Sequence, residues 1–241
     1  MAFQSVFKRY ELKYLLTIEQ KQKLLQAIQP YMQLDKYGRT TIRNLYFDTD
    51  DYLLIRRSIE KPIYKEKLRL RSYAQVDGDT PVYVELKKKF EDVVYKRRIV
   101  ATNDQAMSWL CYGEKPPKDT QIAREIDYVL GFYKELKPRV FLSYQREAYY
   151  CIDGSDFRVT FDDDILCRQD ALSLTEPAHG TSILPRDKVL MELKCSGGIP
   201  LWMSRFLSQE KIYKSSFSKY AAAYKMLIYP QQHILEDKIN A

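Results

Sequence analysis

The chain has 241 residues, of which 45% are hydrophobic and 29% are charged, a composition that excludes an intrinsically disordered protein. Its 39 Lys and Arg outnumber 32 Asp and Glu, and the formal charge of +7 favours anionic partners such as nucleotides, polyphosphate, nucleic acid or acidic lipid. The sequence shows no signal peptide, no membrane-length apolar run and no zinc-type cysteine spacing, so we expect one cytoplasmic domain over residues 1–241 with reduced thiols.

Strand patterns dominate the chain, and helices interrupt them. In chain order we expect a strand at 5–15, a helix at 17–33, a strand at 40–48, a short helix at 50–59, strands at 64–76, 81–89 and 93–100, helices at 104–112 and 121–136, strands at 138–152, 156–162 and 188–195, and helices at 199–208 and 217–229. Residues 163–187 are predicted as a loop or a weak edge strand. Thr17 with Gln20 forms a capping box, and Asn103 and Thr120 are the other expected N-caps.

Turn signals join several of these strands into hairpins. Asp77-Gly78-Asp79, Phe90-Glu91-Asp92 and Asp153-Gly154 each separate two alternating runs. These short connections predict antiparallel pairing.

Successive strand side chains point to opposite faces, and here one face of each strand is charged. The charged faces consist of Arg9, Glu11 and Lys13; Lys65, Lys67, Arg69 and Arg71; Glu85 and Lys87; Arg158, Thr160 and Asp162; and Glu192 and Lys194. An ordinary sheet with one solvated face gives the same alternation. Three features argue against that reading. Ser, Asn and Gln are scarce on the polar faces, E-x-K occurs three times, and several helices are available to cover the apolar faces. We therefore predict an α+β fold, an antiparallel β-barrel tunnel with charges inside and helices packed outside.

A cationic interior is costly when it is empty, since two like charges 4 Å apart repel by roughly 4 kcal/mol at an effective dielectric near 20. A bound polyanion would relieve this repulsion. Alternating Arg69 and Arg71 could each bind two phosphate oxygens, and Glu192 could hold Mg²⁺ or Mn²⁺ beside them. The sequence contains no P-loop, no GxGxxG and no kinase catalytic-loop motif, so side chains would have to bind the phosphates.

An ordered set of short motifs spans nearly the whole chain. They are R-Y-E-L-K-Y (9–14), N-L-Y-F-D-T (44–49), K-L-R-L-R-S-Y (67–73), V-E-L-K (84–87), K-R-R (96–98), R-V-T-F-D (158–162), M-E-L-K (191–194) and S-K-Y (218–220). Together they resemble the VTC domain, the polyphosphate polymerase domain of the vacuolar transporter chaperone family, which belongs to the triphosphate tunnel metalloenzymes. Without the SPX domain and transmembrane segments of the eukaryotic complex, the chain resembles a free-standing member.

The resemblance implies a metal-dependent phosphotransferase that moves the γ-phosphate of ATP onto a growing polyphosphate chain, with Mn²⁺ or Mg²⁺ as cofactor. It implies that phosphates are bound by Lys13, Arg69, Arg71, Lys87, Lys96, Arg98, Arg146, Arg158, Lys194 and Lys219. Among these, the expected catalytic residues are Arg69, Arg71, Lys87, Arg158 and Lys219. Glu192 is the expected main metal ligand, with Glu11 and Glu85 as further candidates.

Other functions stay open from the sequence. A hydrolase of triphosphate or nucleoside triphosphates would use the same site, and the superfamily also contains adenylyl cyclases. A non-enzymatic polyphosphate or nucleotide sensor would need only the binding residues. A nucleic-acid binder is disfavoured, because its bases would be exposed on one groove or helix instead of alternating with glutamates along strands.

Overall fold

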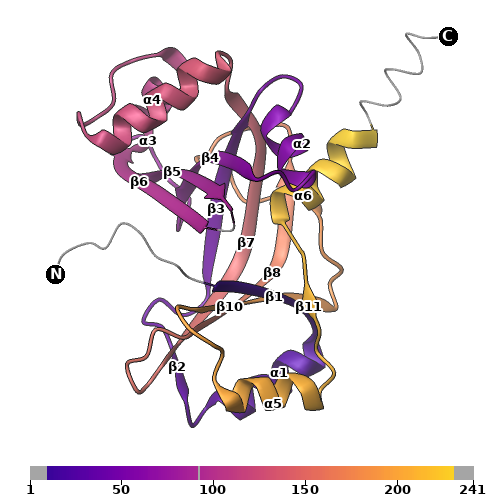
Figure 1. The fold of residues 1–241 in the computed structure, drawn as a ribbon. Coiled ribbons are helices and arrows are strands. Elements are labelled where there is room, and N and C mark those ends of the chain that lie inside the picture. The colour runs from indigo at the N-terminus through magenta and orange to yellow at the C-terminus, as the bar shows by residue number, and fades with distance from the viewer. Residues whose placement is uncertain (1–9, 92, 231–241) are drawn as a thin grey trace.

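One antiparallel sheet of eleven strands organises the computed structural model, which describes residues 10–91 and 93–230 (Figure 1). The strands are β1 (Tyr10–Thr17), β2 (Met32–Leu34), β3 (Thr40–Asp48), β4 (Tyr64–Ser72), β5 (Pro81–Phe90), β6 (Val93–Thr102), β7 (Lys137–Cys151), β8 (Arg158–Arg168), β9 (Thr181–Ser182), β10 (Lys188–Cys195) and β11 (Lys214–Ser215). Hydrogen-bonded neighbours follow the order β11-β1-β10-β8-β7-β3-β4-β5-β6, and β2 and β9 add to β7 and β8. The predicted hairpins β4–β5, β5–β6 and β7–β8 are present.

Helices accompany the sheet at several places along the chain. They are α1 (Ile18–Ile28), α2 (Leu53–Ile59), α3 (Asn103–Tyr112), α4 (Gln121–Tyr133), α5 (Leu201–Gln209) and α6 (Lys219–Ala223), which continues into a π-helical turn, η1 (Tyr224–Ile228). No helix in residues 10–91 and 93–230 has the length and apolar character needed to cross a membrane.

The apolar faces of the strands are buried under helices, as the alternation predicts. On β4 and β5, side chains such as Leu68 and Val84 pack beneath α3 and α4, where Trp109 is fully buried. On β1 and β10, Leu16 and Met191 pack against α1 and α5. These two layers lie at opposite ends of the molecule, joined by the long strands β3, β7 and β8 (Figure 1). Burial of this apolar surface stabilises the fold and directs the alternate, charged side chains to the other face.

The sheet is curved but does not close into the predicted barrel. Within the described residues, its path of paired strands has two ends, at β11 and β6. The curvature nevertheless brings far members of the path together, since Lys87 Nζ of β5 lies 3.1 Å from Glu11 Oε2 of β1. The charged faces of the two halves therefore look toward each other, as the tunnel prediction requires, although backbone pairing does not complete the ring.

Helix α6 departs from the predicted arrangement of helices outside the sheet. Its first residue, Lys219, reaches the carboxylates of Asp162 and Glu192 on the charged face. Its second, Tyr220, stacks on Tyr46 of β3 with 4.5 Å between ring centroids. The helix thus packs on the inner side, because ion pairing and aromatic stacking hold its N-terminal turn there.

Several predicted boundaries were wrong for local reasons. The first helix ends at Ile28, because Pro30 has no amide hydrogen to continue it. The strand predicted over 64–76 ends at Ser72, and the Val76 amide donates to the Leu174 carbonyl of another loop instead. Thr102, not Asn103, caps α3, with Gln105 completing the capping box.

The segment between residues 156 and 187 also differs from its prediction. The strand predicted at 156–162 runs from Arg158 to Arg168, and the short edge strand β9 forms within the ambiguous 163–187 stretch. Residues 5–9 of the first predicted strand and residue 92 of a predicted turn lie outside the described residues.

Candidate phosphate-binding site

Polar side chains from seven strands and α6 converge on the concave side of the sheet, which we call the inner face. Its bases are Lys13, Lys67, Arg69, Arg71, Lys87, Lys96, Arg98, Arg146, Lys194 and Lys219, and its carboxylates are Glu11, Glu85, Asp162 and Glu192. Among the described residues, ten bases thus meet four carboxylates. The inner face keeps a positive excess even when each carboxylate is fully ionised.

Glu85 of β5 is the centre of the first cluster, the Glu85 cluster. Its side chain is 1% exposed, and its oxygens lie 2.6 Å from Arg69 Nη2, 3.8 Å from Arg71 Nε, 2.8 Å from Lys96 Nζ and 2.8 Å from Arg98 Nε. The strand register explains the contacts, since Glu85 stands opposite both Arg69 and Arg98. Burial by itself would raise the pKa of Glu85, but Arg69, Arg71 and Lys96 outweigh it and hold that pKa well below its usual value.

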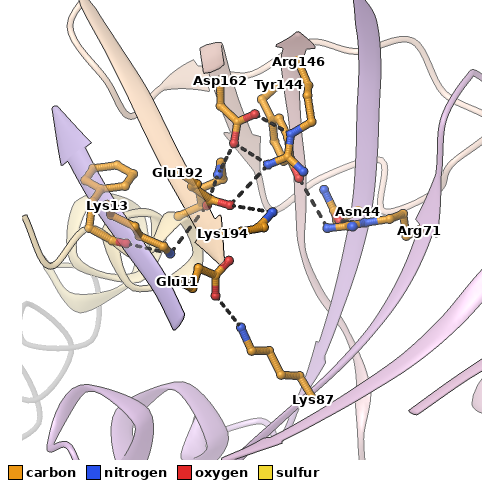
Figure 2. Close-up of polar contacts among 12 residues, drawn as sticks. Glu11, Lys13, Asn44, Arg71, Lys87, Tyr144, Arg146, Asp162, Glu192 and Lys194 are labelled. Atoms are coloured by element: carbon orange, nitrogen blue, oxygen red, sulfur yellow. Dashed lines mark hydrogen bonds and ion pairs between the residues drawn. The ribbon is translucent and has the colours of Figure 1, made fainter. Parts of the chain in front are cut away.

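Asp162 of β8 and Glu192 of β10 are the centre of the second cluster, the Asp162–Glu192 cluster (Figure 2). Lys219 Nζ lies 2.6 Å from Asp162 Oδ2 and 3.3 Å from Glu192 Oε1, so one ammonium joins the two carboxylates. Arg146 Nε lies 2.6 Å from Asp162 Oδ1, and Lys194 and Lys13 lie 3.3 and 3.6 Å from Glu192. Burial opposes ionisation of Glu192, but the four bases keep its pKa well below the usual range.

A polar bridge connects the two clusters. Arg71 donates from Nε to Asn44 Oδ1 at 2.9 Å and from Nη2 to the Tyr144 hydroxyl at 3.3 Å (Figure 2). Burial opposes ionisation of Tyr144, yet Arg146, Arg71 and Lys219 together lower the pKa of its hydroxyl. Tyr144 therefore lies in the field of bases from both clusters, which makes the inner face one continuous cationic surface.

A second set of contacts fixes Lys219 on the inner face. The buried Asp48 carboxylate accepts hydrogen bonds from the amides of Leu54 and Ile55 and from the Tyr220 hydroxyl, the last at 2.9 Å. Tyr220 stacks on Tyr46, whose hydroxyl accepts from Arg69 Nη1 at 3.1 Å. Asp48 thus caps α2 and positions the turn that carries Lys219, while Tyr46 links this support to the Glu85 cluster.

The structure brings together nine of the ten bases predicted to bind phosphate. The tenth, Arg158, is exposed at the first position of β8; it stands opposite Lys194 on the same strand face but forms no ion pair with an inner-face carboxylate among the described residues. Arg97, which lies between the predicted bases Lys96 and Arg98 in the sequence, points to the outer face, where its Nε is 3.0 Å from Glu125 of α4.

The three predicted metal ligands do not form one cluster. The negative charge of Glu192 on β10 acts on Glu11 of the neighbouring strand β1, whereas Glu85 is held by its own bases. In the part of the chain that the structure describes, no three His, Cys, Asp or Glu residues meet as a metal site.

The sequence pattern predicts no role for several residues of this site, among them Lys67, which it places on the charged face. Alternation places Asp162 on the charged face of its strand, as it does Glu192. This shared facing is the sequence feature that could have indicated a role for Asp162. Asn44 and Tyr46 share a strand face with apolar Ile42, so the alternation of polar and apolar residues does not predict that this face is part of the site. Tyr144 lies in an apolar run at a β-bulge between Ser143 and Gln145, where period-two reasoning fails.

The fold and the inner face define a class of protein, and comparison with solved structures gives the same class. An adenylate cyclase-like protein of Bacillus halodurans matches with a TM-score of 0.55 at 16% identity, covering 89% of this chain and 96% of its own. An adenylyl cyclase-like protein of Hippeastrum, for which a dominant triphosphatase activity is described, matches with a TM-score of 0.53 at 19% identity, covering 88% and 92%. These neighbours have triphosphate tunnel folds, and the present chain shares their overall fold, although its sheet does not close within the described residues.

The family follows from the sequence model of the VTC domain, which matches residues 8–228. The chain therefore belongs to the VTC domain family of the triphosphate tunnel superfamily, whose members generally act on triphosphate-type substrates with divalent metal ions. No curated protein matches the chain.

The depressed pKa of Glu85 predicts acid sensitivity. Its folded-state pKa lies below the usual glutamate value of 4.5, so the unfolded chain binds more protons below about pH 4.5 and folding stability falls as the pH falls. We expect Glu85→Gln to reduce the slope of unfolding free energy against pH by up to about 1.4 kcal/mol per pH unit between pH 4.5 and 3. Urea denaturation at each pH measures the slope. Glu114→Gln, at an exposed position, is the control, and equal slopes for the wild type and Glu85→Gln would contradict the prediction.

Proposed function

We propose that the protein is a polyphosphate polymerase that transfers the γ-phosphate of ATP to a growing polyphosphate chain bound along the inner face. Membership of the VTC domain family supports this reaction. The observation that carries the proposal is the pair of carboxylate-centred clusters, joined through Arg71, Asn44 and Tyr144 into one cationic surface. We further propose that the two opposing halves of the curved sheet enclose the phosphates as a tunnel, with Lys87 and Glu11 in contact across it.

The chemistry of such a transfer is mainly positioning and charge stabilisation. Arg69 and Arg71 present guanidinium groups to one part of the phosphate chain, and Arg146 and Lys219 present cations to another. Because their own carboxylates hold these bases in place, little reorganisation is needed when the phosphates bind. The acceptor is an anionic phosphate end, which needs no strong general base. The substrate's charge would be balanced by the positive excess of the inner face.

The residues present fit a divalent metal that is shared with substrate. Mg²⁺ and Mn²⁺ prefer hard oxygen ligands, and Mg²⁺ is often held by one or two carboxylates together with substrate phosphates. Glu192 and Glu11 of the neighbouring strand supply such oxygens. The bases of its own cluster lie 3.3–3.6 Å from Glu192, whereas Arg69 and Lys96 bind Glu85 more closely, at 2.6 and 2.8 Å. A bound metal would neutralise charge on the phosphate oxygens.

Hydrolysis of triphosphate or a nucleoside triphosphate is the second candidate function. The same bases would bind the substrate, and water would replace the polyphosphate end as acceptor. The dominant triphosphatase activity described for the Hippeastrum protein of the same fold favours this alternative. A protein that binds polyphosphate or nucleotide without catalysis would use the same contacts.

The reaction products separate these candidates. We expect incubation with ATP and Mn²⁺ or Mg²⁺ to yield a ladder of long polyphosphate on a gel, because anionic phosphate ends are the proposed acceptors. Release of free phosphate without a ladder would support the hydrolase, and binding without turnover would support the non-enzymatic protein. Either result would overturn the polymerase proposal.

Removal of an inner-face arginine should weaken binding. We expect Arg69→Ala and Arg71→Ala each to reduce tripolyphosphate affinity by about 1.5–3 kcal/mol, the scale of hydrogen bonds to charged groups. Arg97→Ala removes an arginine from the outer face of β6 and should leave the affinity within about 0.5 kcal/mol of the wild type. Calorimetric titration measures all three, and unchanged affinity in both inner-face variants would contradict the assignment.

Glu192 should separate metal-dependent turnover from metal-free binding. We expect Glu192→Gln to abolish metal-dependent turnover, because it removes a charged oxygen ligand while keeping the side-chain shape. Tripolyphosphate affinity in EDTA should be equal or higher, because the substitution adds to the positive excess near Lys194 and Lys219. Full turnover in this variant would place the metal elsewhere, and circular dichroism checks that the fold is retained.

A further inference from the structure

Lys67 of β4 differs from the bases of both clusters because it pairs with no carboxylate in the described part of the chain. Its Nζ donates to Ser218 Oγ at 3.4 Å and lies 6.0 Å from the centre of the Tyr220 ring. Ser218 directly precedes Lys219 of the Asp162–Glu192 cluster. Lys67 therefore contacts, from β4, the same turn of α6 that carries Lys219. Among the described residues, its ammonium therefore has one neutral hydrogen-bond partner and an aromatic face, but no carboxylate partner.

The charged groups that act most strongly on Lys67 are all positive. Lys87 faces it from β5, Lys13 from β1, and Lys65 and Arg69 from its own strand, while α6 contributes the uncharged Ser218 and Tyr220. Lys13 belongs to the Asp162–Glu192 cluster and Arg69 to the Glu85 cluster, so Lys67 lies within electrostatic reach of both. Burial first, and then these four cations, lower the pKa of Lys67 to about 7.

We propose that Lys67 is a further phosphate-binding residue between the two clusters and that it takes up a proton when a polyanionic phosphate chain binds. This inference rests on the proposed function, because it assigns the same ligand class to the same inner face. Phosphate oxygens supply the negative partner that the protein does not provide, and an adjacent anion favours the protonated amine. Binding and protonation are then thermodynamically coupled, and the affinity for inorganic polyphosphate falls as the pH rises through and above 7.

The Lys96 ammonium provides a useful contrast. Burial lowers its pKa to about 8 even though Glu85 lies 2.8 Å away and favours the charged form. Lys96 already has its anionic partner, so a ligand changes its surroundings less than those of Lys67. Lys96 and the ligand exchange the same protons in the wild type and in Lys67 variants. The difference in proton uptake between wild type and variant therefore reports Lys67 alone.

Isothermal titration with tripolyphosphate in EDTA tests the proposal, using two buffers of different ionisation enthalpy between pH 6.5 and 8.5. The decisive variant is Lys67→Arg, which keeps a cation that stays protonated over this range. Lys67→Met removes the cation, and Lys88→Met is the matched control, since Lys88 lies on the outer face 3.5 Å from Glu125. Circular dichroism establishes that each variant is folded.

The wild type and Lys88→Met should take up roughly 0.5–0.9 proton more per bound tripolyphosphate than Lys67→Arg at pH 7.5–8. Between pH 6.5 and 8 the wild-type affinity should fall roughly five- to tenfold relative to Lys67→Arg. Equal proton uptake and equal pH dependence in wild type and Lys67→Arg would overturn the role of Lys67 while leaving the proposed function intact. Absence of tripolyphosphate binding by the wild type would overturn both.

Discussion

The pairing of buried carboxylates with a surplus of bases is the interaction on which the inner face depends. Glu85 lies opposite Arg69 on one neighbouring strand and Arg98 on the other, so a single carboxylate joins β4, β5 and β6 through side chains as well as through backbone pairing. Asp162 and Glu192 do the same for β7, β8 and β10, with Lys219 added from α6. Without these anions the cations would repel one another within the curve of the sheet. Because the bases outnumber them, an anionic ligand is still favoured.

The same arrangement of clusters suits the binding of phosphates in both candidate reactions, polyphosphate synthesis and triphosphate hydrolysis. Polymerase and triphosphatase differ only in the acceptor, an anionic phosphate end or a water molecule, and the clusters would hold the donor phosphates alike in either case. A residue such as Lys67, which changes its charge near neutral pH, affects the binding of the phosphates without selecting the acceptor. Membership of the VTC domain family supports the polymerase, and the product of the reaction decides the matter.

Helix α6 connects the end of the described chain to its beginning. Lys13 Nζ of β1 donates to the Phe217 carbonyl at 3.0 Å, Tyr220 donates to Asp48 at the end of β3, and Lys219 completes the Asp162–Glu192 cluster. The functional surface is thus complete only when segments more than 200 residues apart have come together. Among the described residues, no hydrogen bond or ion pair joins Asp48 or Tyr220 to a proposed phosphate-binding base, and Tyr220 presents only its ring to Lys67, so their role is positioning.

The sequence by itself determined the facing of the strands. The alternation over 65–71, 82–87 and 189–194 placed Arg69, Arg71, Glu85, Lys87, Glu192 and Lys194 on one face, because the side-chain period of a strand is fixed by local backbone geometry. The structure confirms these positions, and the family comparison confirms the resemblance carried by the ordered motifs.

Only the tertiary structure decided how those faces are joined. It separated Glu85 from Glu192 into two clusters, recruited Asn44 and Tyr144 between them, turned α6 inward, and left the sheet open between β11 and β6 in the described residues. Strand order, bulges and helix docking depend on contacts between segments distant in the chain, which local periodicity does not encode. The charge of each face is therefore a property of the sequence. The pairing of those charges, and the lack of a carboxylate partner for Lys67 among the described residues, are properties of the fold.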